Sequence, residues 1–174
     1  LHVVTRRQRQ MCIRDRVLFF LFLSIIWRIN ARKYISSSTV ASAYDAWTQD
    51  KLLERLWGEH IHLGFYPLGK KNIDFRKAKV QFVHELVKWS GLDKLPQGSR
   101  ILDVGCGIGG SSRILAEYYG FNVTGITISQ AQVIRARQLT PHGLNCNFQV
   151  MDALDLKFED GSFDAVWSVE AGAH

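Results

Sequence analysis

The chain has 174 residues, 47% of them hydrophobic, which is enough to bury one core but not two full domains. Its formal net charge of +6 comes from residues 1–33, which hold eight basic side chains and one acidic one, so no nucleic-acid partner is expected for the nearly neutral remainder. Three widely spaced cysteines, Cys12, Cys106 and Cys146, support neither a disulfide framework nor a zinc site, and they favour a reducing, cytosol-facing compartment.

The first 33 residues divide into a segment without hydrophobic periodicity and an apolar segment. Residues 1–16 show no hydrophobic periodicity and are predicted to be non-native read-through that takes no part in the fold. Val17 to Trp27 is almost uniformly apolar and has arginines on both sides. This run is about half of the roughly 20 residues that a membrane-spanning helix needs. Residues 17–33 are therefore interpreted as a hydrophobic helix that serves as a membrane anchor or signal-like segment, with a buried core helix as the alternative.

Residues 34–98 are predicted to form a linker followed by helices. A polar, serine-rich stretch leads into a helix that is expected to start near Thr39. Further on, residues 75–89 repeat apolar side chains at helical spacing, and Gly91 is expected to end that helix. These helices precede the part of the chain in which the chemistry is expected.

Strands and helices alternate in residues 99–174. The pattern predicts strands at 100–104, 122–128, 146–150 and 163–169, with helices at 111–119 and 130–138. Such alternation is typical of right-handed parallel units in a doubly wound sheet. The expected fold class is therefore α/β, with a Rossmann-like doubly wound parallel sheet.

The most informative segment is residues 100–110, RILDVGCGIGG, in which an apolar strand runs through glycines into a helix. Such a turn leaves backbone N–H groups without side chains in front of them, as in nucleotide-type pockets, although a tight turn without a ligand is the alternative. The glycine spacing also fits dinucleotide folds, but there the acid follows the second strand. Here Asp103 precedes the glycines and the second strand ends in Thr127, Ile128 and Ser129, which argues against NAD.

Five runs carry a resemblance to a known family: AYDAWTQD, WGEHIHLGFY, LDVGCGIGGSSRILA, GFNVTGITISQAQVIRA and DGSFDAVWSVEAGAH. They resemble the methyl-phytyl-benzoquinol and tocopherol methyltransferases, a family of class I S-adenosylmethionine (SAM) methyltransferases, from about Tyr34 to His174. The resemblance implies SAM as cofactor and C-methylation of a prenylated benzoquinol in tocopherol and plastoquinone biosynthesis. The apolar N-terminal segment adds a membrane surface as an expected partner, and its basic flanks favour an active domain that faces the cytoplasm or stroma. Another lipid-like acceptor, or a noncatalytic SAM-binding remnant, are the alternatives.

The resemblance also implies a sheet of seven strands, of which this sequence supplies four. We therefore expect the sheet to be truncated after the fourth strand, FDAVWSV, which would expose an apolar edge. The polypeptide alone is expected to bind SAM weakly and to turn over little or nothing.

The same family resemblance implies roles for individual residues around the cofactor. Asp103 would orient the ammonium group of SAM, and the ring of Tyr44 would either hold the cationic sulfonium or pack its helix onto the sheet. Helix capping is the alternative role for Thr127 and Ser129. The remaining cofactor contacts would come from the glycine turn and from the ends of the second and third strands: Gly105, Gly107, Gly109, Thr127, Ile128, Ser129, Gln132, Asp152 and Ala153.

A general base would help the transfer, because a ring carbon becomes a good nucleophile when a neighbouring phenol loses its proton. The candidates are His60 and His62 in WGEHIHLG, and His174 beyond the fourth strand, where Glu170 could orient or replace it. Each histidine could instead be structural. Glu59 with the first two histidines lacks a further ligand, so no metal site is expected.

Overall fold

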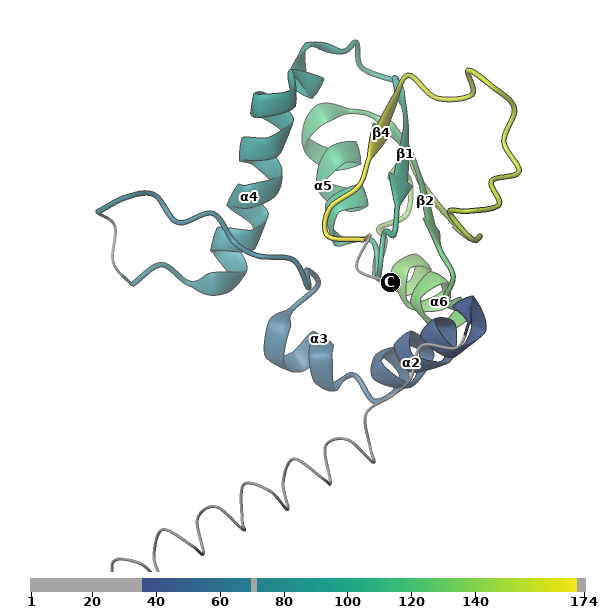
Figure 1. Cartoon of the computed structure of the whole chain (residues 1–174). Coiled ribbons are helices and arrows are strands. Elements are labelled where there is room, and N and C mark those ends of the chain that lie inside the picture. The colour runs from purple at the N-terminus through teal and green to yellow at the C-terminus, as the bar shows by residue number, and fades with distance from the viewer. Residues whose placement is uncertain (1–35, 70–71, 172–174) are drawn as a thin grey trace, which may run out of the picture. The chain divides into compact units, whose positions relative to one another are not determined.

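The computed structural model describes residues 36–69 and 72–171 (Figure 1). The predicted read-through at 1–16 and the predicted anchor at 17–33 lie outside the described residues. Within the described part, no helix combines the length and the apolar character needed to cross a membrane. The elements in chain order are α2 (Ser37–Gln49), α3 (Leu52–Trp57), α4 (Phe75–Ser90), the 3-10 helix η1 (Leu92–Lys94), β1 (Arg100–Val104), α5 (Gly110–Tyr119), β2 (Asn122–Thr127), α6 (Gln130–Leu139), β3 (Cys146–Val150) and β4 (Ala165–Trp167).

The four strands form one parallel sheet in the order β3-β2-β1-β4. β1 pairs with β2 from Arg100 opposite Asn122 to Val104 opposite Ile126. On its other side β1 pairs with β4, with Asp103 opposite Trp167. Because all four strands run the same way, their carboxyl ends meet at one edge of the sheet. The Rossmann-like parallel sheet predicted from the alternation of elements is confirmed.

The main core lies between the sheet and the helices α4 and α5. Val83 and Val87 of α4, Leu115 of α5 and Ile101 of β1 are all completely buried there. The predicted helix at 75–89 is confirmed, and the sequence explains both of its ends. Asp74 caps the start of α4 by accepting from the N–H groups of the second and third residues of the helix. Gly91 ends it in the left-handed conformation, with φ 74°.

Element boundaries differ from the predictions mainly at the sheet edge. α5 begins at Gly110, slightly earlier than predicted, because the chain already turns at Gly109. β4 is three residues long, whereas seven were predicted, and it pairs only with β1. Its middle residue, Val166, is 65% exposed, so the expected apolar edge is present.

Candidate cofactor and active site

The glycine turn lies at the carboxyl end of β1. Gly105, Gly107 and Gly109 all have positive φ, at 73°, 56° and 80°, which side-chain-bearing residues rarely adopt. An added Cβ at Gly105 would lie 2.3 Å from Cβ of Ala171, and one at Gly109 would lie 2.6 Å from Cζ of Phe148. At Gly107 it would meet nothing within 4 Å. The outer two glycines are therefore required by packing, whereas Gly107 borders open space in front of the turn.

Asp103 is a buried carboxylate immediately before this turn, with 3% of its surface exposed. The hydroxyl of Ser112 donates to its Oδ2 at 2.5 Å and is its only hydrogen-bond partner among the described residues. Burial raises the pKa of Asp103 to about 6. An acid with a single neutral donor is one that a cationic group would stabilise, since a positive charge favours the ionised form.

The polar residues at the end of β2 have partners within the protein. The Thr127 hydroxyl donates to Oε1 of Gln132 at 2.7 Å, and Oγ of Ser129 accepts from the Gln132 backbone N–H at 3.1 Å. All three side chains are buried. Ser129 thus makes the contact expected of a helix cap at the start of α6. The hydroxyl proton of Thr127 is used in its hydrogen bond to Gln132. Ile128 is half-buried between them.

The two residues predicted after β3 lie at the same edge of the sheet. Met151 continues the pairing by donating to the Thr127 carbonyl at 3.0 Å. Asp152 then starts a turn in which its Oδ1 accepts from the Leu154 N–H at 2.9 Å, and Ala153 is exposed. The carboxyl ends of β1, β2 and β3 thus bring together the predicted cofactor residues.

Asp45 on α2 is a residue of this region to which the sequence gave no role. Its Oδ1 accepts from the Ser129 hydroxyl at 2.5 Å and from the Ala131 N–H at 3.0 Å, so it binds the N-terminal end of α6. No local pattern could reveal a contact between residues 84 positions apart. Its neighbour Tyr44 is half-buried, which raises its pKa, and its ring meets that of Trp47 edge to face with centroids 5.5 Å apart.

Replacing Asp45 by alanine is expected to lower the free energy of unfolding by about 1–2 kcal/mol, as for loss of other N-terminal helix caps. The change removes an acceptor from Ser129 and from Ala131 and detaches α2 from α6. Hydrogen exchange followed by mass spectrometry should show faster exchange in α2. Gln49→Ala, at the exposed end of the same helix, is the control, and equal exchange in both variants would contradict the role assigned to Asp45.

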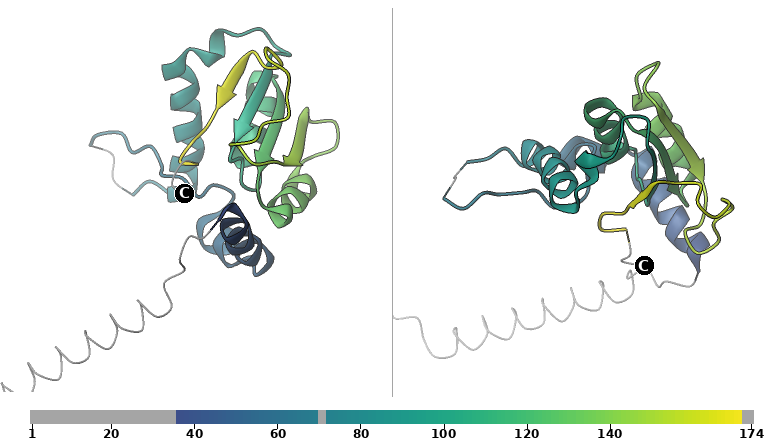
Figure 2. Two further views of the ribbon diagram at one scale, coloured as in Figure 1. Left: turned by 45° about the vertical axis from the view of Figure 1, so that its right-hand side comes forward. Right: turned by 90° about the horizontal axis from the view of Figure 1, so that it is seen from above.

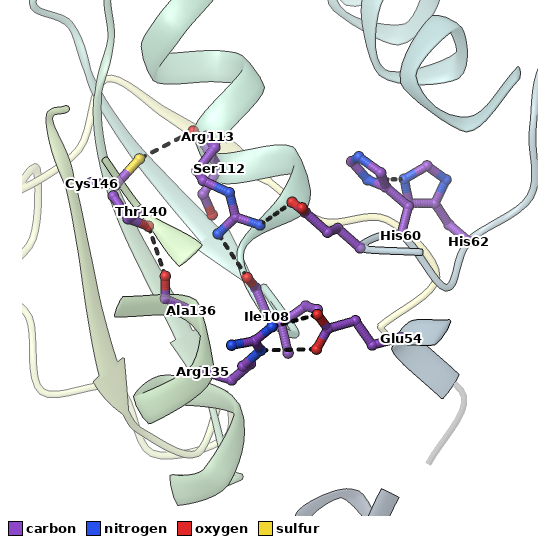
Figure 3. Close-up of polar contacts among 11 residues, drawn as sticks. Glu54, His60, His62, Ile108, Ser112, Arg113, Arg135, Ala136, Thr140 and Cys146 are labelled. Atoms are coloured by element: carbon purple, nitrogen blue, oxygen red, sulfur yellow. Dashed lines mark hydrogen bonds and ion pairs between the residues drawn. The ribbon is translucent and has the colours of Figure 1, made fainter. Parts of the chain in front are cut away.

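Two ion pairs hold the following segment against the same side of the domain (Figure 3). Glu54 accepts from both Nε and Nη2 of Arg135, at 2.8 and 2.5 Å. Glu59 accepts from Nη2 of Arg113 at 2.5 Å, while Nη1 of the same arginine donates to the Ile108 carbonyl in the glycine turn at 2.8 Å. Glu59 is thus the partner of an arginine. Within residues 36–69 and 72–171, no group of three or more His, Cys, Asp or Glu side chains is arranged to hold a metal.

The structure brings together His60, His62 and Glu170, although they come from distant parts of the chain. Nε2 of His62 lies 3.1 Å from Nδ1 of His60, and Nδ1 of His62 lies 2.7 Å from the Leu63 carbonyl oxygen. The Leu63 N–H donates to Oε1 of Glu170 at 3.1 Å. Burial lowers the pKa of His62, and it lowers that of His60 to about 3. His174 lies outside the described residues.

Comparisons with known proteins bear on the family and the fold of the chain. Residues 101–174 match the family described as methyltransferase domain. The chain is 59% identical over 152 residues to the 2-methyl-6-phytyl-1,4-hydroquinone methyltransferase of Synechocystis sp., covering 86% of this chain and 47% of that protein. It is 40% identical to the chloroplastic tocopherol O-methyltransferase of Arabidopsis thaliana, covering 71% of this chain and 38% of that one. The chain therefore spans about half the length or less of these relatives.

Solved structures share the same fold. The (4+2)-cyclase SpnF superposes with a TM-score of 0.64 at 30% identity, covering 76% of this chain and 48% of that one. Geranyl diphosphate C-methyltransferase from Streptomyces coelicolor A3(2), in complex with S-adenosyl-L-homocysteine, gives a TM-score of 0.56 at 23% identity, covering 76% of this chain and 54% of that one. The chain thus carries four strands of a Rossmann-like, class I methyltransferase domain, and within that family it is similar to the methyl-phytyl-quinol and tocopherol methyltransferases.

Proposed function

We propose that the chain is part of a SAM-dependent methyltransferase that C-methylates a prenylated benzoquinol in tocopherol and plastoquinone biosynthesis. The 59% identity to the methyl-phytyl-hydroquinone enzyme carries this proposal. Identity falls to 42% and 40% with the rice and Arabidopsis proteins that are described as tocopherol O-methyltransferases, the first of these as probable. The quinol is therefore favoured over tocopherol as the acceptor.

SAM is the proposed cofactor, and the carboxyl edge of the sheet offers groups that fit it. SAM supplies an electrophilic methyl group on a sulfonium. The buried Asp103 carboxylate suits its ammonium group, and the open space in front of Gly107 lets the backbone approach it. Tyr44 would face the sulfonium, with a cation–π contribution of about 0.5–2 kcal/mol. The ribose and adenine would lie over the ends of β2 and β3, near Ile128, Asp152 and Ala153.

Transfer of a methyl group from a sulfonium is an in-line displacement, so the protein's main task is placement of the acceptor and exclusion of water. The segment from Asp45 to Glu59 is bound along the carboxyl edge by three carboxylates, so it can cover the reacting groups. Proton removal from the quinol hydroxyl is assigned to the region of His60, His62, Glu170 and His174.

An apolar acceptor calls for contact with a membrane, and we propose that residues 17–33 anchor the chain there. Residues 34–98 and 99–174 would then form the covering and the cofactor-binding parts of an active domain facing the cytoplasm or stroma. The segment between α3 and α4 projects away from the sheet (Figure 2). It exposes Leu63 and Leu68 at 73% and 103%, which is compatible with an apolar neighbour.

Calorimetric titration of the 174-residue chain tests the cofactor assignment. SAM and S-adenosylhomocysteine are expected to bind and NADH is not, because β2 ends in Thr127, Ile128 and Ser129 and not in the acidic residue that a nicotinamide dinucleotide needs. Binding of NADH alone, or of none of the three by a chain whose circular dichroism shows it to be folded, would contradict the proposal. A methyl-transfer assay with the quinol is expected to give little or no product from this chain alone.

A further inference from the structure

His60 is held in place through both its backbone and its ring. Nζ of Lys79, a side chain that is 95% buried, donates to the His60 carbonyl at 2.7 Å and to the Trp57 carbonyl at 3.2 Å. The imidazole lies against the first residue of α5, where a Cβ added at Gly110 would come within 2.8 Å of Cε1 and 2.9 Å of Nδ1. The ring is therefore fixed beside the glycine turn.

The rings of the two histidines are in contact (Figure 3), and the direction of their hydrogen bonds follows from their chemistry. A carbonyl oxygen can only accept, so Nδ1 of His62 must carry the proton that it gives to Leu63. In neutral His62 the other ring nitrogen, Nε2, then has a lone pair and must accept from Nδ1 of His60. His60, also neutral, is left with its own lone pair on Nε2. That nitrogen has no hydrogen-bond partner among the described residues.

Glu170 supports this direction from the other end of the chain. By accepting from the Leu63 N–H, it fixes the backbone of the residue whose carbonyl orients His62. Glu170 also has φ 54°, a left-handed conformation that is strained in a residue with a side chain and is concentrated at functional sites. Such strain is compatible with a positioning role for Glu170.

The charges around His60 determine which kind of ligand group can form a hydrogen bond with its Nε2. His62 from the same segment, Lys79 from α4 and Arg113 from α5 all disfavour positive charge on the ring. The N-terminal end of α5, against which the ring lies, acts in the same sense. A cationic ligand is therefore disfavoured at Nε2, and a neutral donor is favoured. In a quinol, that donor is a phenolic hydroxyl.

We propose that His60 Nε2 accepts a hydrogen bond from a hydroxyl of the quinol, and that His62 and Glu170 are positioning residues that fix the required His60 tautomer. This inference rests on the proposed function and assigns separate roles within the histidine group. His60 is the residue that touches the acceptor. The other two act only through it.

Two-bond nitrogen–proton NMR spectra of the ¹⁵N-histidine-labelled chain report each tautomer directly at neutral pH. Both His60 and His62 are expected to carry their proton on Nδ1, with signals assigned from His60→Gln and His62→Gln. In His62→Ala, which has no side-chain acceptor, His60 is expected to move toward the Nε2-protonated form that is commoner in solution. His84→Gln is the control, because His84 bonds the Tyr119 hydroxyl instead. An Nε2-protonated or cationic His60 in the unsubstituted chain would overturn the proposal.

Titration with 1,4-hydroquinone then tests the ligand. The His60 Nε2 signal is expected to shift, and 1,4-dimethoxybenzene, which has no hydroxyl, is expected to leave it unchanged. Loss of the shift in Glu170→Ala, with restoration in Glu170→Gln, whose amide oxygen still accepts, separates a positioning role from a general structural one. Failure of hydroquinone to shift the signal would overturn the assignment. Because neither spectrum requires SAM or turnover, this failure is distinct from a failure of SAM to bind.

Discussion

Replacing Asp103 by asparagine is expected to stabilise the protein at neutral pH and to weaken SAM binding strongly. Burial raises the pKa of this carboxyl from 3.8 to about 6, so between these pH values the folded state binds more protons than the unfolded state. The contribution of Asp103 to the free energy of unfolding therefore falls as the pH rises through this window. Above pH 6, the loss in the free energy of unfolding that is due to Asp103 amounts to about 3 kcal/mol. Asparagine has no charge to bury and can keep the Ser112 contact through its amide oxygen.

The same substitution removes the negative charge proposed to hold the ammonium group of SAM. Losing one partner of a buried charge pair costs about 2–5 kcal/mol, so affinity should fall by at least about 30-fold. Urea unfolding at pH 4 and pH 7.5 together with calorimetry would measure both effects. Ser112→Ala is the companion variant: it keeps the Asp103 carboxyl group, whose pKa is expected to rise further because the hydrogen bond that lowers it is lost. Unchanged affinity in Asp103→Asn would remove Asp103 from the cofactor site.

Gly109→Ala is expected to lower mainly the stability of the protein, whereas Gly107→Ala is expected to lower mainly its affinity for SAM. At Gly109 the new methyl group would overlap Phe148, which is 1% exposed and cannot move away within the core. Positive φ costs about 1–2 kcal/mol and overpacking about 1–3 kcal/mol more, so Gly109→Ala should lose several kcal/mol of stability. Gly107→Ala has only the first cost, because its methyl group would meet no atom within 4 Å.

Gly107→Ala should nevertheless bind SAM at least about tenfold more weakly, a loss of about 1.4 kcal/mol. Its methyl group would occupy the space through which the cofactor is proposed to approach the backbone. Thermal unfolding and calorimetry of both variants provide the comparison, with Gly143→Ala as a control for positive φ in open space away from the turn. If Gly107→Ala bound SAM like the parent chain, the cofactor would not lie against this glycine.

The sequence predicted well those features that depend on neighbouring residues. An apolar strand, a glycine turn and a helix follow one another within residues 100–119, and their order alone determines that Asp103 and the glycines share one end of the sheet. The helix of residues 75–89 carries its own start and stop signals at Asp74 and Gly91. Such signals act within a few residues, so reading them requires no knowledge of the tertiary structure.

Contacts between distant segments could not be predicted in the same way. Asp45 with Ser129, Glu54 with Arg135 and Glu59 with Arg113 join positions 54 to 84 residues apart, and many other carboxylates and arginines could have paired. The tertiary arrangement decides among them. It also explains why the hydroxyls at the end of β2, expected to contact the cofactor, have protein partners. Asp45, to which the sequence analysis gave no role, accepts hydrogen bonds from Ser129 and Ala131 at the N-terminal end of α6.

The order of the strands has a consequence for synthesis on the ribosome. β1, β2 and the glycine turn require only residues up to the start of α6, so this part of the sheet can pair as soon as that length has emerged. Glu170, in contrast, reaches Leu63 only after β4 has been translated and has added to the open side of β1. A nascent chain would therefore form its glycine turn before its two histidines are aligned, so that the proposed cofactor site takes shape before the proposed contact with the acceptor.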